Sequence, residues 1–88
     1  MKKDRGETFY VYILLCADTS LYIGSTNNLE KRLHEHNHLK SGAHYTKIRR
    51  PVTLQYTEQY CTYKEARTRE AGLKTLTREQ KLHLLKKK

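Results

Sequence analysis

The order of apolar and polar positions near the start of the chain predicts a β-hairpin. Residues 9–16 are almost continuously apolar and rich in β-branched and aromatic side chains, which is typical of a strand covered on both faces. A polar turn at 17–20 follows, and residues 21–25 return as a second strand. Gly24 would weaken that strand unless another group has to approach its backbone.

After this hairpin the apolar period changes to that of a helix. Leu29 and Leu33 are four residues apart, so they lie on one helical face. Asn27 or Asn28 can cap the helix, which is expected to extend to about Asn37.

The second half of the chain predicts one more strand and two more helices. In residues 38–50 the apolar positions follow no regular spacing, so this segment is expected to form a loop. In residues 52–57 apolar and polar positions alternate, which predicts a third strand. Two capping boxes, Thr-x-x-Glu and Thr-x-x-Gln, predict the starts of the helices. These helices follow Thr62 and Thr77 and are expected over about 63–75 and 78–86.

The predicted order of elements, β-β-α-β-α-α, favours an α/β (α+β) fold. We expect a small three-stranded sheet, antiparallel or mixed, flanked by helices. A chain of 88 residues is expected to form one domain over 1–88, with a core at about 9–85 and a basic tail at 86–88. The pattern leaves the order of the strands beyond the first hairpin open.

The longest apolar segment and the cysteines bear on the cellular location. The uncharged run 9–17 is too short to cross a bilayer, and the basic start leads into Asp4 rather than into a cleavage site. Cys16 and Cys61 belong to no zinc or disulfide motif, so both are expected to be reduced, buried thiols. We therefore expect a cytoplasmic protein without a membrane partner.

Positive charge lies mainly in the second half of the chain. Residues 1–44 carry six Lys/Arg and five Asp/Glu, whereas residues 45–88 carry twelve and four, which accounts for most of the net charge of +9. Such a surface on folded elements is typical of proteins that bind nucleic acid in a salt-sensitive manner. The residues expected to form this docking surface are Lys47, Arg49, Arg50, Arg67, Arg69 and Lys74.

A carboxylate interrupts the apolar arc of the helix predicted at 63–75. At about 100° per residue from Ala66, Leu73 falls at roughly 340° and Glu70 at roughly 40°, so Glu70 is expected to face the sheet. A carboxylate in that position must be paired, protonated or bound to a metal ion. An ion pair with a neighbouring arginine and a metal site both remain open.

A polar stripe adjoins the apolar stripe of the first helix. Asn28, Arg32 and His36 are spaced i, i+4 and i+8 along one side. The arginine could clamp a phosphate, and the histidine could accept a proton or hold a phosphate or water. The alternative is a solvated helix edge without a chemical role.

The histidines around this helix do not predict a zinc site. Side chains at i and i+2 of a helix diverge by about 200° and cannot grip one ion. This argument applies to the cluster His34, His36, His38 and His44.

The hairpin carries one tyrosine on each strand. Tyr12 and Tyr22 share a face only if the connecting loop has an odd number of residues; pairing Leu14 with Tyr22, for example, places Tyr12 opposite Gly24. The missing side chain would then leave room for a ring or a substrate. With a two-residue loop the tyrosines would point to opposite faces of the hairpin. The alternative to a chemical role is that both rings only fill the hydrophobic core.

Taken together, these positions resemble the motifs of the GIY-YIG nuclease superfamily. The similarity is greatest to small stand-alone bacterial members, and it extends over about 9–85. The residues that carry it are Tyr10-Val11-Tyr12, Tyr22-Ile23-Gly24, Asn28-Leu29-x-x-Arg32-Leu33-x-x-His36 and Glu65-Ala66-x-x-x-Glu70-x-x-Leu73-Lys74.

The resemblance implies a three-stranded antiparallel sheet and the metal-dependent cleavage of DNA phosphodiesters. By this resemblance Glu70 would hold one Mg²⁺ or Mn²⁺ ion, and Arg32 would bind the scissile phosphate. One of Tyr12 and Tyr22 would activate the attacking water and the other would position the phosphate, while His36 would transfer a proton or contact phosphate.

Three hypotheses about function follow. The first is an endonuclease that acts on DNA rather than RNA, in repair or recombination. The second is a nucleic-acid-binding module that keeps the fold without catalysis, and the third is an adaptor within a larger assembly. We expect a monomer, with specificity supplied by a protein partner.

Overall fold

The computed structural model describes residues 7–38 and 44–86. The centre of the predicted loop, 39–43, and most of the predicted basic tail lie outside these ranges. The described elements are β1 (Phe9–Leu15), β2 (Leu21–Thr26), α1 (Leu29–His38), α2 (His44–Lys47), β3 (Thr53–Tyr60), α3 (Tyr63–Lys74) and α4 (Arg78–Lys86).

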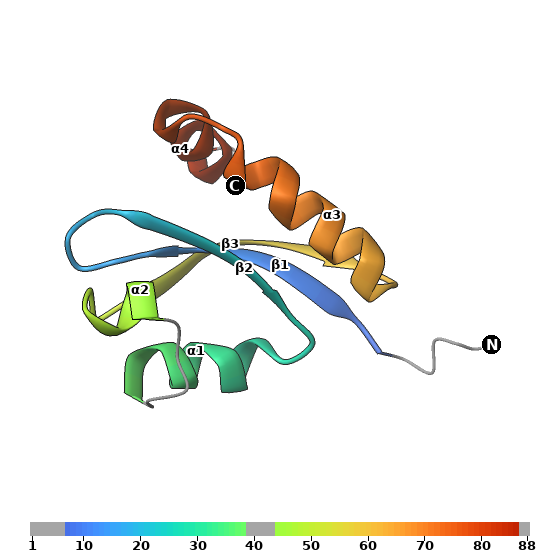
Figure 1. Ribbon diagram of the computed structural model, residues 1–88, viewed down its shortest axis with the longest axis horizontal. Helices are drawn as coiled ribbons and strands as arrows, with labels where there is room; N and C mark the ends of the chain where they lie inside the picture. The colour runs from blue at the N-terminus through green and yellow to red at the C-terminus, as the bar shows by residue number, and fades with distance from the viewer. Residues whose placement is uncertain (1–6, 39–43, 87–88) are drawn as a thin grey trace.

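The strands form one antiparallel sheet in the order β2-β1-β3. Helices α1 and α2 lie on one side of this sheet, and α3 and α4 lie on the other (Figure 1). The predicted fold class and element order are confirmed. Because β1 is central, its residues are covered from both sides, in agreement with the nearly continuous apolar run.

The hairpin has the register that brings the two tyrosines to one face. Leu14 pairs with Tyr22, and Tyr12 pairs with Gly24. The last pair is Leu15 with Leu21, so the loop spans 16–20 and has an odd number of residues. Of the two alternatives that the sequence left open, the structure therefore has the odd loop, with both tyrosines on one face.

Alternation along the strands divides the interior into two small cores. On the side of α3 and α4 the buried residues are Val11, Ile13, Ile23, Ala66 and Leu73. On the side of α1 they are Tyr12, Leu14, Cys16 and Val52, with Leu29 and Leu33 packed against them. Each helix pair thus buries its apolar stripe on one face of the sheet.

Both capping boxes lie where they were predicted. Thr62 Oγ1 accepts a hydrogen bond from the Glu65 backbone at 3.1 Å. Thr77 forms the reciprocal arrangement with Gln80, with distances of 2.9 Å and 3.1 Å. These bonds satisfy backbone donors at the starts of α3 and α4.

Three sequence predictions need correction. Residues 44–47 form the short helix α2 within the predicted loop. The third strand continues to Tyr60, because Arg69 of α3 hydrogen-bonds the polar Glu58 near the end of this strand. Cys61 is exposed rather than buried, since it lies in the turn directly after this strand, whereas Cys16 is buried as expected.

Glu58 is the centre of a polar cluster that joins β3 to α3. Arg69 donates to both of its carboxylate oxygens, at 2.8 Å and 3.0 Å, and the hydroxyls of Tyr56 and Tyr60 donate as well. Burial disfavours the charged form, but these hydrogen bonds outweigh it and lower the pKa of Glu58 to about 2.

This cluster predicts a loss of stability in acid. An unfolded glutamate titrates near its ordinary pKa of 4.5, so the contribution of Glu58 is complete above that pH and disappears as the pH falls toward 2. We expect Glu58→Gln to lower the free energy of unfolding by about 1–3 kcal/mol at pH 7, and the difference from wild type to shrink below pH 4.5. Urea unfolding between pH 7 and pH 2.5 measures this, with the exposed Glu30→Gln as control. A difference independent of pH would contradict it.

Candidate active site

Residues from both faces of the sheet meet at its β2 edge. They line a groove of about 430 Å³. Its lining comprises Tyr12, Tyr22, Gly24, Ser25, Arg32, Tyr63, Arg67 and Glu70. Four of the five residues expected to carry the chemistry therefore border one groove, and the fifth, His36, lies directly behind Tyr12.

Gly24 explains how a residue of the central strand reaches this edge. A Cβ atom at this position would lie 2.5 Å from the Tyr12 hydroxyl oxygen and 2.7 Å from Cζ of the same ring. The phenol thus occupies the space that a side chain on β2 would fill. A glycine is needed here for close approach, as the sequence suggested.

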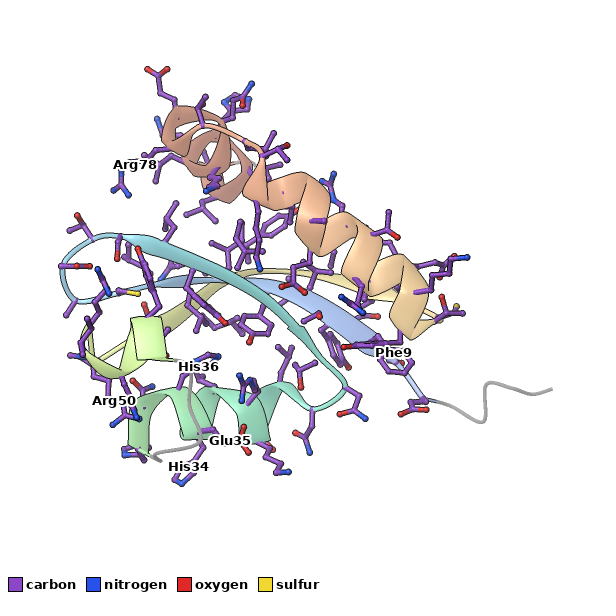
Figure 2. The ribbon with its side chains drawn as sticks, in the orientation of Figure 1. Phe9, His34, Glu35, His36, Arg50 and Arg78 are labelled. Carbon is purple, nitrogen blue, oxygen red and sulfur yellow. The ribbon has the colours of Figure 1, made fainter. Side chains whose placement is uncertain are left out.

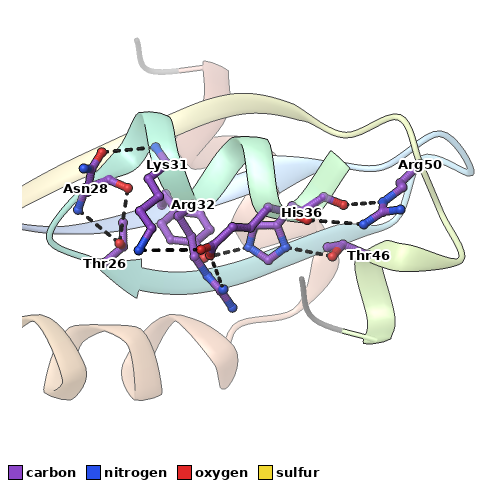
Figure 3. A network of polar contacts seen from close by, with 9 residues as sticks. Thr26, Asn28, Lys31, Arg32, His36, Thr46 and Arg50 are labelled. Carbon is purple, nitrogen blue, oxygen red and sulfur yellow. Dashed lines mark hydrogen bonds and ion pairs between the residues drawn. The ribbon is translucent and has the colours of Figure 1, made fainter. Parts of the chain in front are cut away.

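Tyr12 and His36 begin a chain of buried polar side chains. The Tyr12 hydroxyl lies 2.9 Å from Nε2 of His36, and Nδ1 of the same ring lies 2.7 Å from Oγ1 of Thr46. Figure 3 shows the imidazole of α1 with its bond to Thr46 on α2. His36 and Thr46 are both 0% exposed, so protein groups rather than bulk water fix the ring.

The charge state of this pair follows from burial. Burial raises the pKa of Tyr12 to about 12, although the nearby Arg32 guanidinium opposes the rise. Burial and the positive charge of Arg32 lower the pKa of His36 to about 4, with Arg50 acting in the same direction and Glu35 against it. At neutral pH both side chains are therefore uncharged.

Arg32 lies where α1 meets the groove. Its Nη1 donates to Glu35 Oε1 at 2.8 Å, and its side chain is 29% exposed. Lys31 approaches the other oxygen of Glu35 at 3.8 Å. The guanidinium is thus oriented by an ion pair, while its position in the groove lining leaves it able to meet an anion.

Asn28, the first member of the predicted stripe, caps α1. Its Oδ1 accepts from the Lys31 backbone at 3.1 Å, and its own backbone N–H donates to Thr26 (Figure 3). This residue therefore positions Arg32 and His36 through the start of the helix.

Glu70 reaches the groove from the opposite side of the sheet. Ser25 Oγ donates to its Oε1 at 2.7 Å, and Lys74 Nζ lies 2.8 Å from its Oε2. Burial disfavours the carboxylate, but the hydrogen bonds from Lys74 and Ser25 outweigh this effect and lower the pKa of Glu70. The position on the apolar arc is therefore occupied by a carboxylate that is ionised at neutral pH and has two partners.

This carboxylate suits a hydrated magnesium ion better than a metal held by protein alone. Within 7–38 and 44–86, no three His, Cys, Asp or Glu side chains gather into a metal-ligating group. Mg²⁺ keeps several waters and takes one or two carboxylates together with substrate phosphates. A single ionised Glu70 on a groove that also carries Arg32 and Arg67 fits that mode.

Tyr22 packs its ring into the aromatic wall of the groove. Its centroid lies 6.5 Å from that of Tyr12, 5.1 Å from that of His36 and 5.8 Å from that of Tyr45. The two hairpin tyrosines are thus neighbours on the α1 side. Both rings contact His36, Tyr12 through a hydrogen bond at its hydroxyl and Tyr22 edge-on through its ring.

The histidines of α1 diverge as the spacing predicted. His34 and His38 are exposed and stack at 4.6 Å, whereas His36 points inward. Figure 2 shows His36 directed toward the sheet and His34 away from it. The side chain of His44 lies outside the described residues.

The six predicted docking residues lie on three parts of the surface. Arg67 borders the groove, and Lys74 lies beside Glu70. Arg69 is held by Glu58 on the β3 side. Lys47, Arg49 and Arg50 lie in or after α2, on the other face of the sheet.

Two of these latter residues are engaged with the protein itself. Arg49 pairs with Asp18 at 3.0 Å and lies over the Tyr45 ring at 3.9 Å. Arg50 donates to the backbone carbonyl of His36 at 2.5 Å, near the end of α1 (Figure 3). These contacts anchor the chain directly after α2, the helix that carries Thr46.

Sequence reasoning did not identify two residues that contact the site. Thr46 lies in the segment 38–50, where the apolar residues follow no helical or strand period and no motif indicates a functional residue. Ser25 follows the Tyr22-Ile23-Gly24 string, but a serine alone does not signal a partner 45 positions away in the chain. Only the folded arrangement reveals their contacts with His36 and Glu70.

No helix within the described ranges has the length and apolar character needed to cross a membrane.

Residues 8–83 match the family described as the GIY-YIG catalytic domain. A UPF0213 protein of Clostridium perfringens is 54% identical over 79 residues, which cover 90% of this chain and 84% of that protein. A UPF0213 protein of Syntrophus aciditrophicus is 52% identical over 77 residues, 88% of each chain.

Two solution NMR structures have a similar fold. A protein from E. faecalis superposes with a TM-score of 0.63 and 41% identity, covering 97% of this chain and 90% of that one. The UPF0213 protein BH0048 of Bacillus halodurans gives a TM-score of 0.59 and 37% identity, covering 92% and 85%. Since the family match extends over most of the chain, this protein belongs to the GIY-YIG family, and its homologues are UPF0213 proteins.

Proposed function

We propose that this protein is a divalent-metal-dependent endonuclease that hydrolyses phosphodiester bonds of DNA rather than RNA, in repair or recombination. One observation carries the proposal: Arg32, Tyr12 and Glu70 border one groove although they come from three elements and two sides of the sheet. The family has a nuclease-like fold, and its nucleases generally depend on divalent metal ions.

Arg32 would bind the scissile phosphate. A guanidinium presents a planar set of donors that matches two phosphate oxygens, and it keeps its charge at any physiological pH. As the phosphorus becomes pentacoordinate, negative charge accumulates on those oxygens. Arg32, which Glu35 holds in place through an ion pair, therefore stabilises the transition state.

Tyr12 would remove the proton from the attacking water with the help of His36. A phenol whose pKa is about 12 cannot act as a phenolate at neutral pH. It can accept a proton from water while it gives its own proton to Nε2 of His36, 2.9 Å away. The neutral imidazole is in the right charge state to receive it.

Glu70 would hold one Mg²⁺ or Mn²⁺ ion. When bound, such an ion lowers the pKa of its water and acts as a Lewis acid toward the phosphate. Ser25 and Lys74 each bond one carboxylate oxygen, so they fix its orientation and keep it ionised. Tyr22 would position the phosphate or water from the α1 side of the groove, opposite Glu70.

The test is a cleavage assay on the purified wild-type protein. Supercoiled, branched and single-stranded DNA and a matched RNA are incubated with Mg²⁺ or Mn²⁺ and, in parallel, with EDTA. The proposal expects metal-dependent strand scission of DNA and little scission of RNA. Salt-sensitive binding without scission would instead support the nucleic-acid-binding module, in which Arg67 and Lys74 serve only to dock phosphates.

Arg32 provides a graded test of the phosphate role. We expect Arg32→Ala to reduce the cleavage rate about 100-fold or more, and Arg32→Lys to recover only part of it, because lysine keeps the charge but not the two-pronged geometry. Single-turnover rates on the preferred DNA measure both variants. Arg78→Ala, an exposed arginine on α4, serves as the control for lost surface charge. Equal rates for the two alanine variants would rule out this role.

A further inference from the structure

The imidazole of His36 has a second hydrogen-bond partner besides Tyr12. Nδ1 lies 2.7 Å from the hydroxyl of Thr46, and both side chains are 0% exposed. Thr46 belongs to α2, and Arg49 and Arg50 hold the chain that follows. The partner of Nδ1 is therefore a buried side chain on an anchored segment, and solvent does not provide it.

A neutral imidazole has one donor nitrogen and one acceptor nitrogen, so its two partners decide which tautomer is present. The hydroxyls of Tyr12 and Thr46 can each donate or accept. The Arg32 guanidinium can only donate hydrogen bonds, and it borders the same groove as Tyr12. A cation on this groove favours the lone pairs of the Tyr12 oxygen over its proton, so the proton is best directed at Nε2 of His36, 2.9 Å away. Nε2 must then be the bare nitrogen.

We propose that Thr46 is a positioning residue: its hydroxyl accepts the Nδ1 proton of His36 and thereby holds the tautomer whose Nε2 can receive the proton of Tyr12. This inference rests on the proposed nuclease function. It adds a requirement for a hydroxyl at position 46, on a helix that does not border the groove.

The attacking water gives one proton to the Tyr12 oxygen, and the original Tyr12 proton passes to Nε2. The water oxygen forms its bond to phosphorus while the bond to the leaving oxygen breaks, and that oxygen takes a proton from solvent. The imidazolium later returns its extra proton to solvent. Throughout, Nδ1 keeps its proton and donates it to Thr46.

The surroundings of His36 make this support necessary. Tyr12 and Tyr22 face the ring from β1 and β2, Arg32 and Glu35 flank it on α1, and Arg50 lies before β3. Since both arginines disfavour an imidazolium, an oxygen that accepts from Nδ1 stabilises the ring when it is protonated. Removal of the oxygen should therefore affect proton transfer more than folding.

The first test reads the tautomer directly. Long-range ¹H–¹⁵N spectra of protein labelled with ¹⁵N-histidine distinguish a protonated Nδ1 from a protonated Nε2. We expect Nδ1–H in wild type and in Thr46→Ser, which retains the hydroxyl. In Thr46→Val the valine offers Nδ1 neither a donor nor an acceptor, so the proton is expected on Nε2, where it can be donated to Tyr12. Wild-type protein with the proton on Nε2 would overturn the proposal without any variant.

The second test reads the reaction. On the DNA cleaved by wild type, we expect Thr46→Val to lower the single-turnover rate about 10–100-fold and Thr46→Ser to stay within a few-fold of wild type. The apparent affinity for DNA should be unchanged, because Thr46 does not border the groove. A valine variant that cleaves at the wild-type rate would refute the role. Should wild type not cleave DNA, the proposed function fails, while the tautomer measurement still decides what Thr46 does.

Discussion

Replacing Glu70 by glutamine is expected to abolish most cleavage, with a fall in rate of about 1000-fold or more. Glutamine has nearly the same shape and can still accept the hydrogen bond from Ser25, so the fold should persist. It lacks the negative charge that would hold a divalent cation, and a neutral amide is a far weaker ligand for Mg²⁺. The loss should appear in the chemical step more than in DNA binding.

The measurement compares single-turnover rates of wild type, Glu70→Gln and Glu79→Gln at saturating Mg²⁺. Glu79 is an exposed glutamate in the first turn of α4, so its replacement changes the net charge equally without touching the groove. We expect the Glu79 variant to cleave like wild type. Equal rates for the two glutamine variants would show that Glu70 has no part in the chemistry.

Adding a single methyl group at Gly24 is expected to disrupt both the fold and the site. The new Cβ would lie 2.5 Å from the Tyr12 hydroxyl oxygen, well inside van der Waals contact. The phenol cannot simply turn aside, because the ring is buried and its hydroxyl is bonded to His36. We expect Gly24→Ala to lower the free energy of unfolding by about 1–3 kcal/mol and cleavage at least about 100-fold.

Gly72 supplies the matched control for this substitution. A Cβ at Gly72 would meet nothing within 4 Å, and the residue lies inside α3. Gly72→Ala should therefore raise the free energy of unfolding by about 0.5–1 kcal/mol, because alanine favours helix. Urea unfolding and cleavage are measured for both variants. A Gly24→Ala protein as stable and active as wild type would exclude the close packing of Tyr12 on β2.

Local pattern was sufficient to predict much of this site. Strand alternation predicted that Tyr12 and Tyr22 share a face if the hairpin loop is odd, and the loop at 16–20 meets that condition with Tyr12 opposite Gly24. The helical period placed Glu70 toward the sheet, where it contacts Ser25. In each case the face on which a side chain lies depends only on the period of its own strand or helix, so it can be predicted from neighbouring residues in the sequence.

Contacts between distant segments were not predictable in this way. Thr46 meets His36 because α2 folds back beside α1, and a four-residue helix has too few positions for a period. The strand β3 extends past its predicted end because Arg69 neutralises Glu58 from another element. A count of basic residues likewise cannot separate Arg67, at the groove, from Arg69, which is engaged by that carboxylate.

The most direct test of the account asks where a divalent cation binds, and it needs no knowledge of the DNA target. Mn²⁺ is titrated into ¹⁵N-labelled protein, and paramagnetic broadening of the backbone amides is followed by NMR. We expect early broadening centred on Ser25 and Glu70, at the β2 edge, and its loss in Glu70→Gln. Broadening centred on the exposed His34 and His38 pair, or unchanged by the Glu70 substitution, would contradict a metal-dependent site in this groove.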